Sequence, residues 1–416
     1  MDILRIATAG SVDDGKSTLI GRLLYDTKSI TKDKLEAVVN TSRRKGLDFT
    51  DLSLLTDGLI AEREQGITID VAHIYFGTAT RKYIIADTPG HIEYTRNMIT
   101  GASNAEASIV LIDARNGVIE QTRRHLFISS LLDLETVFIC INKMDLVNFD
   151  ENVFHAIREK VKDLAEKIGF EGQLEFIPIA AKDGDNVVQK SGRMSWYKGH
   201  SLLELLEVLP VHQKDETLPA RFPVQYVIRP HSEEYHDYRG YAGKLESGTL
   251  SEGDEIIVLP TLRKSRIKKI LHGEKHVNIA RAGDSVSIEL DEDLDISRGN
   301  MIVPSGAAYV QSGNFTATLN WMDETPLTPG KTYLLQHGVN MVKAKVMSIQ
   351  AKLDIETMEE IKDATQFRLN DIGRVVIKTA KPIFADVYRE NPRNGSFILI
   401  DEFSNNTAAV GFVERA

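Results

Sequence analysis

The stretch "GSVDDGKST", residues 10–18, joins the apolar run "ILRIATA" to the segment "LIGRLLYDTKSI", in which leucine and isoleucine recur at helical spacing. It therefore lies between a predicted strand and a predicted helix. In this position it fits the pattern G-x-x-x-x-G-K-[ST], which is typical of a phosphate-binding loop. The alternative, a glycine-rich turn that only caps a helix, is disfavoured by the strand and helix on either side. The matching residues are Gly10, Gly15, Lys16 and Ser17.

Each residue type in this loop has its own chemical role. Glycine accepts positive φ angles and lets the backbone approach a ligand, so that successive N–H groups and the helix N-terminus face one anion. We expect Lys16 to contact the β- and γ-phosphate oxygens and the Ser17 hydroxyl to bind Mg²⁺. The residues predicted to surround the phosphates are Gly10, Ser11, Val12, Asp13, Asp14, Gly15, Lys16, Ser17 and Thr18.

Length and composition indicate a multidomain protein. A chain of 416 residues suggests two or three domains. No apolar run reaches the roughly 18 residues of a membrane span, and the N-terminus has no basic region or cleavage site, so we expect a cytoplasmic protein. The net charge of −10 disfavours a general nucleic-acid-binding surface. The one cysteine, Cys140, lies in an apolar run and is expected to be a buried thiol.

Strand-like and helix-like segments alternate over the first half of the chain. Apolar runs such as "KYIIADT", "ASIVLIDA", "TVFICIN" and "LEFIPIA" are separated by helical segments such as "VFHAIREKVKDLAEKIG". This pattern predicts an α/β domain with a mostly parallel sheet and helices on both faces. Its last helix is "SLLELLEVLP", where Ser201 and Glu204 form a capping box and Pro210 marks the end.

The second half of the chain has short β-rich runs punctuated by glycine and proline, such as "FPVQYVI" and "DEIIVLP". Such runs predict a β-barrel. Further β-rich runs, with one helix-like interruption around 355–367, predict a second barrel. The predicted domains are therefore 1–211 (α/β), 212–311 (β-barrel) and 312–416 (second β-barrel).

A second motif, "NKMD" at 142–145, follows an apolar strand and predicts the base that is bound. The Asp145 carboxylate can accept hydrogen bonds from N1–H and the exocyclic amine of guanine, which adenine does not offer. We expect Asn142 to brace the phosphate loop and the Lys143 stem to lie across the ring. The later segment "IAAKDGDN" supplies a second base-facing loop, in which the Ala181 N–H meets guanine O6 and Lys182 covers the other face. The residues of this loop are Ala180, Ala181 and Lys182.

Two further segments are predicted to detect the γ-phosphate. In "DTPGH" at 87–91, Asp87 holds Mg²⁺ through water, the Gly90 N–H reaches the γ-phosphate, and His91 orients the attacking water. Thr68 in "EQGITID" ligates the same ion. These contacts are lost when the γ-phosphate leaves, which predicts an order–disorder switch. The predicted catalytic residues are Lys16, Thr68, Gly90 and His91, the predicted metal ligands are Ser17, Thr68 and Asp87, and Thr88 and Pro89 are also placed at the nucleotide.

Together the four motifs and the two predicted barrels resemble the translation-factor-type GTPases, such as elongation factors Tu and 1-alpha, over nearly the whole chain. The resemblance implies a P-loop GTPase domain that binds GTP or GDP with Mg²⁺ and hydrolyses GTP. Two departures stand out. Asp14 replaces the histidine or similar residue that elongation factors usually carry, and Ala180 replaces a serine found in many relatives, so that it has no hydroxyl to brace its loop.

Within that family, the segments 10–26, 55–76, 87–103 and 370–412 are most similar to the large GTPase subunits of bacterial sulfate adenylyltransferases. This similarity implies a partner, a small catalytic subunit that joins ATP and sulfate to give adenosine 5′-phosphosulfate and pyrophosphate, in a heterodimer or larger complex. GTP hydrolysis would drive that unfavourable reaction. No membrane or nucleic-acid partner is expected.

The main alternative is an elongation factor that delivers aminoacyl-tRNA to the ribosome. Contacts with tRNA phosphates need clustered lysine and arginine, and "TLRKSRIKKI" at 261–270 is a candidate. The same stretch is equally consistent with one solvated strand face. A selenocysteine-type or initiation-type factor is a weaker alternative, because those chains carry additional domains.

Overall fold

The computed structural model describes residues 2–44, 46, 50–55, 71–89, 95–210, 214–229 and 238–415. Their contacts divide the chain into two compact units, Met1–Val211 with Asp354–Glu359 and His212–Leu353 with Glu360–Ala416. The boundary predicted between 211 and 212 falls on residues outside these ranges.

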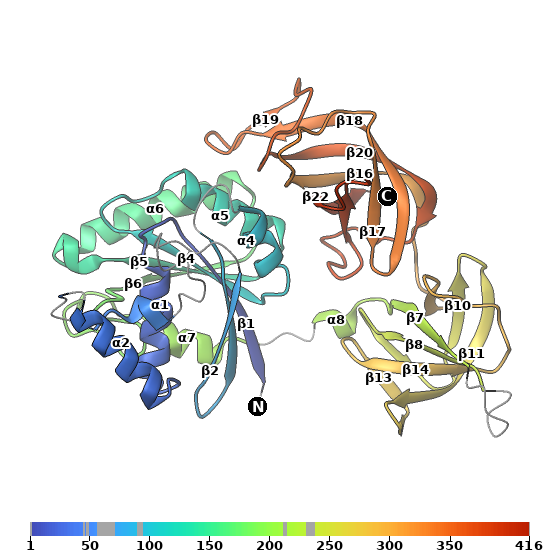
Figure 1. Ribbon diagram of the computed structural model, residues 1–416, viewed down its shortest axis with the longest axis horizontal. Helices are drawn as coiled ribbons and strands as arrows, with labels where there is room; N and C mark the ends of the chain where they lie inside the picture. The colour runs from blue at the N-terminus through green and yellow to red at the C-terminus, as the bar shows by residue number, and fades with distance from the viewer. Residues whose placement is uncertain are drawn as a thin grey trace. The chain divides into compact units, whose positions relative to one another are not determined.

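The first unit is built on a six-stranded sheet with the order β2-β3-β1-β4-β5-β6 (Figure 1). The β2–β3 pair is antiparallel, and every other neighbouring pair is parallel. In such a sheet the parallel strands end at a common edge, where ligands of open α/β sheets bind. The strands are β1 Ile3–Ala9, β2 Ala72–Gly77, β3 Lys82–Asp87, β4 Ala107–Asp113, β5 Thr136–Asn142 and β6 Gln173–Pro178.

Helices cover both faces of this sheet, with α1 and α7 on one side and α4, α5 and α6 on the other (Figure 1). The Ser201 hydroxyl accepts from the Glu204 N–H and the Glu204 carboxylate accepts from the Ser201 N–H, so the predicted capping box is present. The helices are α1 Lys16–Asp26, α2 Lys32–Arg44, α4 Thr95–Ala102, α5 Glu120–Leu131, α6 Glu151–Lys167 and α7 Leu202–Val208, and the short 3₁₀ turns are η1 Leu52–Leu55 and η3 Met144–Val147.

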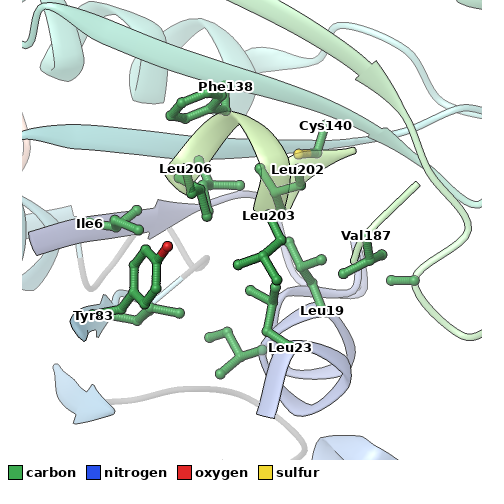
Figure 2. Close-up of a cluster of buried hydrophobic side chains, with 14 of the residues drawn as sticks. Ile6, Leu19, Leu23, Tyr83, Phe138, Cys140, Val187, Leu202, Leu203 and Leu206 are labelled. Atoms are coloured by element: carbon green, nitrogen blue, oxygen red, sulfur yellow. The ribbon is translucent and has the colours of Figure 1, made fainter. Parts of the chain in front are cut away.

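One hydrophobic cluster of the first unit lies between the sheet and helices α1 and α7 (Figure 2). Residues two apart on a strand point to the same face, and residues four apart on a helix do the same. The strands contribute Ile6, Tyr83, Phe138 and Cys140, and the helices contribute Leu19, Leu23, Leu202 and Leu206. This packing fixes α1, and therefore the loop that precedes it, against the sheet.

The second unit begins with α8 Lys214–Thr217 and contains two barrels. In the first barrel, six strands in the order β10-β15-β7-β8-β14-β11 close into a ring through the β10–β11 pairing, and β12 extends from β11. Strands β9 and β13 form a separate ribbon. The strands are β7 Phe222–Ile228, β8 Gly240–Lys244, β9 Thr249–Ser251, β10 Glu255–Leu259, β11 Arg263–His272, β12 Lys275–Val277, β13 Ile279–Arg281, β14 Ser285–Leu290 and β15 Met301–Pro304.

The second barrel closes in the same way. Its ring has the order β17-β21-β22-β16-β20-β18, the β17–β18 pairing joins the ends, and β19 extends from β18. All of these pairings are antiparallel. The strands are β16 Ser312–Trp321, β17 Thr332–His337, β18 Asn340–Leu353, β19 Glu360–Ile361, β20 Ile372–Ile383, β21 Ser396–Ile400 and β22 Thr407–Arg415.

One local prediction is wrong. Residues 355–367 form no helix but a turn followed by the two-residue strand β19. The Asp354 carboxylate accepts from the backbone N–H groups of Glu356 and Thr357, as at a helix start. Met358 then has a φ of +60°, which a right-handed helix does not allow. The chain therefore leaves the helical path after one turn.

The predicted fold class is confirmed: a mostly parallel sheet with helices on both faces is followed by two antiparallel barrels. The predicted burial of Cys140 is also confirmed, and burial raises the pKa of its thiol. Over the described ranges, the structure has no helix that is both long and apolar enough to span a membrane.

Candidate functional site

The phosphate loop lies at the carboxyl end of β1, where "GSVDDGKST" leads into α1. Gly15 occupies the N-cap of α1 with a φ of +96°, a region that favours glycine. A Cβ atom at this position would lie 2.5 Å from the Asn142 Nδ2 atom, so no larger residue fits. No side chain caps the helix. Its first N–H groups are therefore left for an anion.

The Lys16 side chain crosses this loop. Its ammonium donates to the carbonyl oxygens of Gly10 at 2.8 Å and Ser11 at 3.1 Å. Burial lowers the pKa of Lys16, while the nearby carboxylates of Asp87, Asp14 and Asp13 act in the opposite direction. Lys16, which the sequence predicts to contact the phosphates, therefore lies in a buried, polar loop.

Asp14, the unusual residue of the loop, folds its side chain back onto the loop itself. Its carboxylate accepts from the Ser11 N–H at 2.6 Å, and only 3% of the residue is exposed. Burial raises the pKa of this carboxyl, against the effect of the Ser11 hydrogen bond and of Lys16. Asp14 therefore fixes the shape of the loop and places an acidic group beside Lys16.

Asn142, the last residue of β5, joins the phosphate loop to the predicted base loop. Its Nδ2 donates to the Asp14 carbonyl at 2.7 Å, and its Oδ1 accepts from the Ala181 N–H at 3.0 Å. Both contacts are buried. The Ala181 N–H is thus already engaged, so its predicted bond to guanine O6 requires that this donor be shared with Asn142 or released by it.

The two charged residues of "NKMD" differ in their surroundings. The Lys143 ammonium lies 3.0 Å from the Asp113 carboxylate, which Arg115 also binds in a bidentate way. Burial would raise the pKa of Asp113, but its hydrogen bonds to Arg115 and Lys143 lower that pKa to about 2. Asp145 lies in η3, and among the described residues none donates a hydrogen bond to its carboxylate. Its acceptors are therefore not committed to another group.

The base loop follows β6. Ala180 and Ala181 are buried, and Lys182 is exposed. The Ala180 carbonyl accepts from the N–H groups of Asp183 and Gly184, which makes a tight turn. The loop therefore has a defined backbone shape although Ala180 has no hydroxyl.

The end of β3 lies beside the phosphate loop. The Thr8 hydroxyl donates to the Asp87 carboxylate at 2.9 Å, and the Thr88 hydroxyl donates to the Thr8 carbonyl at 2.5 Å. Asp87, Thr88 and Pro89 are all buried. Three predicted site residues, Thr68, Gly90 and His91, lie outside the described residues.

Two of the predicted ligands suit Mg²⁺, because the Ser17 hydroxyl and the Asp87 carboxylate both supply hard oxygen atoms. Ser17 lies in the first turn of α1, and the Asp87 carboxylate is close enough to Lys16 to act on its pKa. Over the described ranges, no three His, Cys, Asp or Glu residues form a cluster that would hold a metal. A metal at this place would therefore need oxygens from the nucleotide or water as well, as Mg²⁺ at phosphates does.

Sequence patterns alone did not indicate Thr8, Arg22, Asp113 or Arg115. Arg22 on α1 donates to the carbonyls of Ala181 and Lys182 in the base loop. Asp113, at the end of β4, stands directly opposite Asn142 in the parallel β4–β5 register. Asp113 could have been found from the sequence, because it is a polar residue at the carboxyl end of a buried parallel strand.

Comparisons with known proteins agree with this geometry. Residues 1–214 match the family model of the elongation factor Tu GTP binding domain, and residues 314–414 match that of the GTP-eEF1A C-terminal domain-like family. The chain is 47% identical over 422 residues to sulfate adenylyltransferase subunit 1 of Bacteroides thetaiotaomicron, covering 99% of this chain and 86% of that protein. It is 47% identical over 414 residues to the subunit 1 of Saccharophagus degradans, covering 99% of this chain and 87% of that protein.

A longer relative is the bifunctional enzyme CysN/CysC of Mycobacterium tuberculosis strain H37Rv, 49% identical over 414 residues, which cover 99% of this chain and 67% of that protein. The match to the elongation factor Tu domain implies that the chain binds GTP or GDP. The chain belongs to the family of sulfate adenylyltransferase subunit 1, translation-factor-type GTPases that act in sulfate activation.

Proposed function

We propose that this GTPase couples GTP hydrolysis to the synthesis of adenosine 5′-phosphosulfate from ATP and sulfate, which a separate small catalytic subunit carries out. The proposal rests on one observation: the phosphate loop and the base loop of the first unit are joined into one nucleotide site. Asn142 joins one phosphate loop to one base loop, and the sequence contains one G-x-x-x-x-G-K-[ST] motif. A site of this kind serves one nucleotide, so the adenylyl transfer to sulfate needs a second protein.

Within this site, the loop from Gly10 to Thr18 holds the phosphates and Lys16 neutralises their charge. Asp145 recognises the N1–H and 2-amino group of guanine, while the loop at 180–182 recognises the 6-oxo group. Lys143 covers one face of the base, with its ammonium held by Asp113. The phosphate loop and the base loop are held in shape by the two hydrogen bonds of Asn142, and the Lys143 ammonium is held by its ion pair with Asp113.

Ser17, Thr68 and Asp87 would hold Mg²⁺ together with the nucleotide. A magnesium ion there would stabilise the negative charge that develops on the phosphate oxygens. Asp87 suits this role because its carboxylate is oriented by Thr8 and shares the buried surroundings of Lys16. Thr68 is included in this set only because of its place in the motif "EQGITID".

His91 orients the attacking water, and Thr68 with Gly90 responds to the γ-phosphate. Loss of that phosphate removes two contacts at once, which releases both segments. We propose that the domains 1–211, 212–311 and 312–416 transmit this change to the small subunit. By linkage, substrates of the partner then alter the affinity of this chain for its nucleotide.

The test measures phosphate release from GTP and pyrophosphate release from ATP in the same reaction. The isolated chain should turn over slowly, and the rate should rise when the small subunit, ATP and sulfate are all present. Thr68→Ala should abolish the dependence of pyrophosphate release on GTP while the complex still forms in gel filtration. Stimulation of GTP hydrolysis by ribosomes and aminoacyl-tRNA, with none from ATP and sulfate, would refute the proposal in favour of an elongation factor.

A further inference from the structure

Arg22 connects the helix after the phosphate loop to the predicted base loop. The side chain leaves α1 six residues after Lys16 and reaches a loop about 160 residues later in the chain. Its Nε donates to the Ala181 carbonyl at 3.3 Å, and an NH2 group donates to the Lys182 carbonyl. Only 17% of the side chain is exposed. One guanidinium therefore holds two consecutive carbonyls of the base loop.

Two residues of α1 and one glycine of the base loop lie beside the Arg22 side chain. Its NH1 atom lies 3.6 Å from the Asp26 carboxylate, one helical turn along α1, and its guanidinium lies over the Tyr25 ring at 5.7 Å. On the loop side, a Cβ at Gly184, which has a φ of +91°, would come within 3.3 Å of the Arg22 Cδ atom. The glycine thus allows the close approach of the arginine to the turn.

Two other contacts hold the same turn from different directions. Asn142 accepts from the Ala181 N–H, and Arg193 forms ion pairs with Asp183 and Asp185 just beyond Lys182. The Arg193 side chain is half exposed, so its pairs contribute less than buried ion pairs would. The Arg22 contacts act on the backbone itself, at Ala181, whose N–H is the predicted guanine O6 donor, and at Lys182, the residue after it.

The geometry points to a specificity role, and we propose that Arg22 is the positioning residue for recognition of the guanine 6-oxo group. The peptide bond is planar and trans, so a held carbonyl also fixes the N–H on the opposite side of the same peptide plane. The Ala181 and Lys182 carbonyls share their peptide planes with the Lys182 and Asp183 N–H groups, so Arg22 fixes these two amides directly. It restrains the Ala181 N–H, the predicted O6 donor, through the backbone of Ala181 itself. The inference rests on the proposed guanine site, in which the loop at 180–182 recognises O6 and Asp145 recognises the N1–H and 2-amino group.

An arginine is needed because its planar, forked guanidinium donates to two carbonyls at once. A lysine carries one compact ammonium and would hold one carbonyl well. Removing Arg22 leaves the phosphate loop, Asn142 and Asp145 in place but frees the loop backbone. The variant should then lose the part of its nucleotide affinity that comes from recognition of the guanine 6-oxo group.

The experiment compares equilibrium affinities of the full chain for three nucleotides: GTP, 6-thio-GTP and ITP. In 6-thio-GTP a weak sulfur acceptor replaces O6, and ITP lacks the 2-amino group read by Asp145. Wild type should prefer GTP over each analogue by roughly tenfold or more. Arg22→Ala should reduce the GTP to 6-thio-GTP preference to about twofold and leave the GTP to ITP preference unchanged. Arg22→Lys should give an intermediate value.

Two matched variants serve as controls. Asp26→Asn removes the ion-pair partner and keeps the arginine, and Arg5→Ala removes an exposed arginine of the same unit. Both should retain the wild-type preferences. Because each preference is a ratio of two affinities of one variant, a smaller folded fraction does not change it.

Equal loss of both preferences in Arg22→Ala, or no change in either, would overturn the positioning role. A wild-type chain that binds GTP and 6-thio-GTP equally would overturn the assignment of the loop to O6, and the inference with it. Failure of wild type to bind GTP at all would instead refute the proposed function. The three results are distinct in the same set of titrations.

Discussion

Replacement of Asn142 by alanine tests the link between the two nucleotide-binding loops. The side chain makes two buried hydrogen bonds, to the Asp14 carbonyl at 2.7 Å and from the Ala181 N–H at 3.0 Å. A buried polar group left without a partner costs about 1–3 kcal/mol. Two such groups predict a loss of about 2–6 kcal/mol in the free energy of unfolding of the first unit. Freed loops also predict a decrease in GTP affinity of roughly tenfold or more.

Asn186→Ala is the matched control. This asparagine is also buried in the first unit, donates to the Pro178 carbonyl at 2.8 Å and accepts from the Ser191 N–H at 2.7 Å. It makes the same kinds of bonds without touching the phosphate loop. Its replacement should reduce the unfolding free energy by a similar amount and leave the affinity of the folded protein for GTP within about twofold of wild type.

Urea unfolding followed by tryptophan fluorescence measures the stability change. The chain has two tryptophans, Trp196 in the first unit and Trp321 in the second, so a Trp321→Phe background reports the first unit alone. Nucleotide affinity is measured by calorimetry under conditions where each variant is folded. Equal effects of Asn142→Ala and Asn186→Ala on GTP affinity would refute the idea that Asn142 couples the loops.

The other predictions concern single roles in the same site. Asp145→Asn should shift the preference from GTP to XTP in a competition assay, because the new amide donor faces the 2-carbonyl of xanthine, and a retained preference for GTP would contradict the guanine assignment. His91→Ala should slow GTP turnover by about 10²-fold with little change in the dissociation constant, whereas Lys16→Ala should mainly weaken binding, so that equal changes in binding would argue against separate roles. The lowered pKa of Asp113 stabilises the folded state above pH 3.8, an effect lost as the pH falls toward about 2. Unfolding free energies measured across that window should therefore decrease more steeply for wild type than for Asp113→Asn.

Local patterns were sufficient to predict most of the architecture. The runs "KYIIADT", "ASIVLIDA" and "TVFICIN" form β3, β4 and β5. Burial on both faces makes such strands continuously apolar, so they are visible in the sequence. The composition of residues 355–367 favours a helix, whereas the observed turn depends on the Asp354 side chain and on the left-handed backbone at Met358.

The site was predictable only in part. Loops such as "GSVDDGKST" and "NKMD" carry their residue types within a few positions, so the sequence indicates them directly. Arg22 lies in an ordinary amphipathic helix, and nothing near it in the sequence indicates that its partners are the carbonyls of Ala181 and Lys182. The role of such a residue follows from tertiary contacts between distant segments. Its partners here are backbone carbonyls, which every residue carries, so the sequence does not indicate them.

The closure of the two barrels limits how a partner protein can attach. Within the described strands of the second unit, the long strands are paired on both sides, and the strands that extend a ring, β12 and β19, have three and two residues. A partner strand needs a free row of backbone N–H and C=O groups to extend a sheet. In the open sheet of the first unit, β2 and β6 are the outer strands. Among the described strands, those with a free edge of more than three residues are therefore β2 and β6, since β9 and β13 have three residues each. A subunit that adds a long strand would pair with β2 or β6, and one that binds the barrels would recognise mainly their side chains and loops.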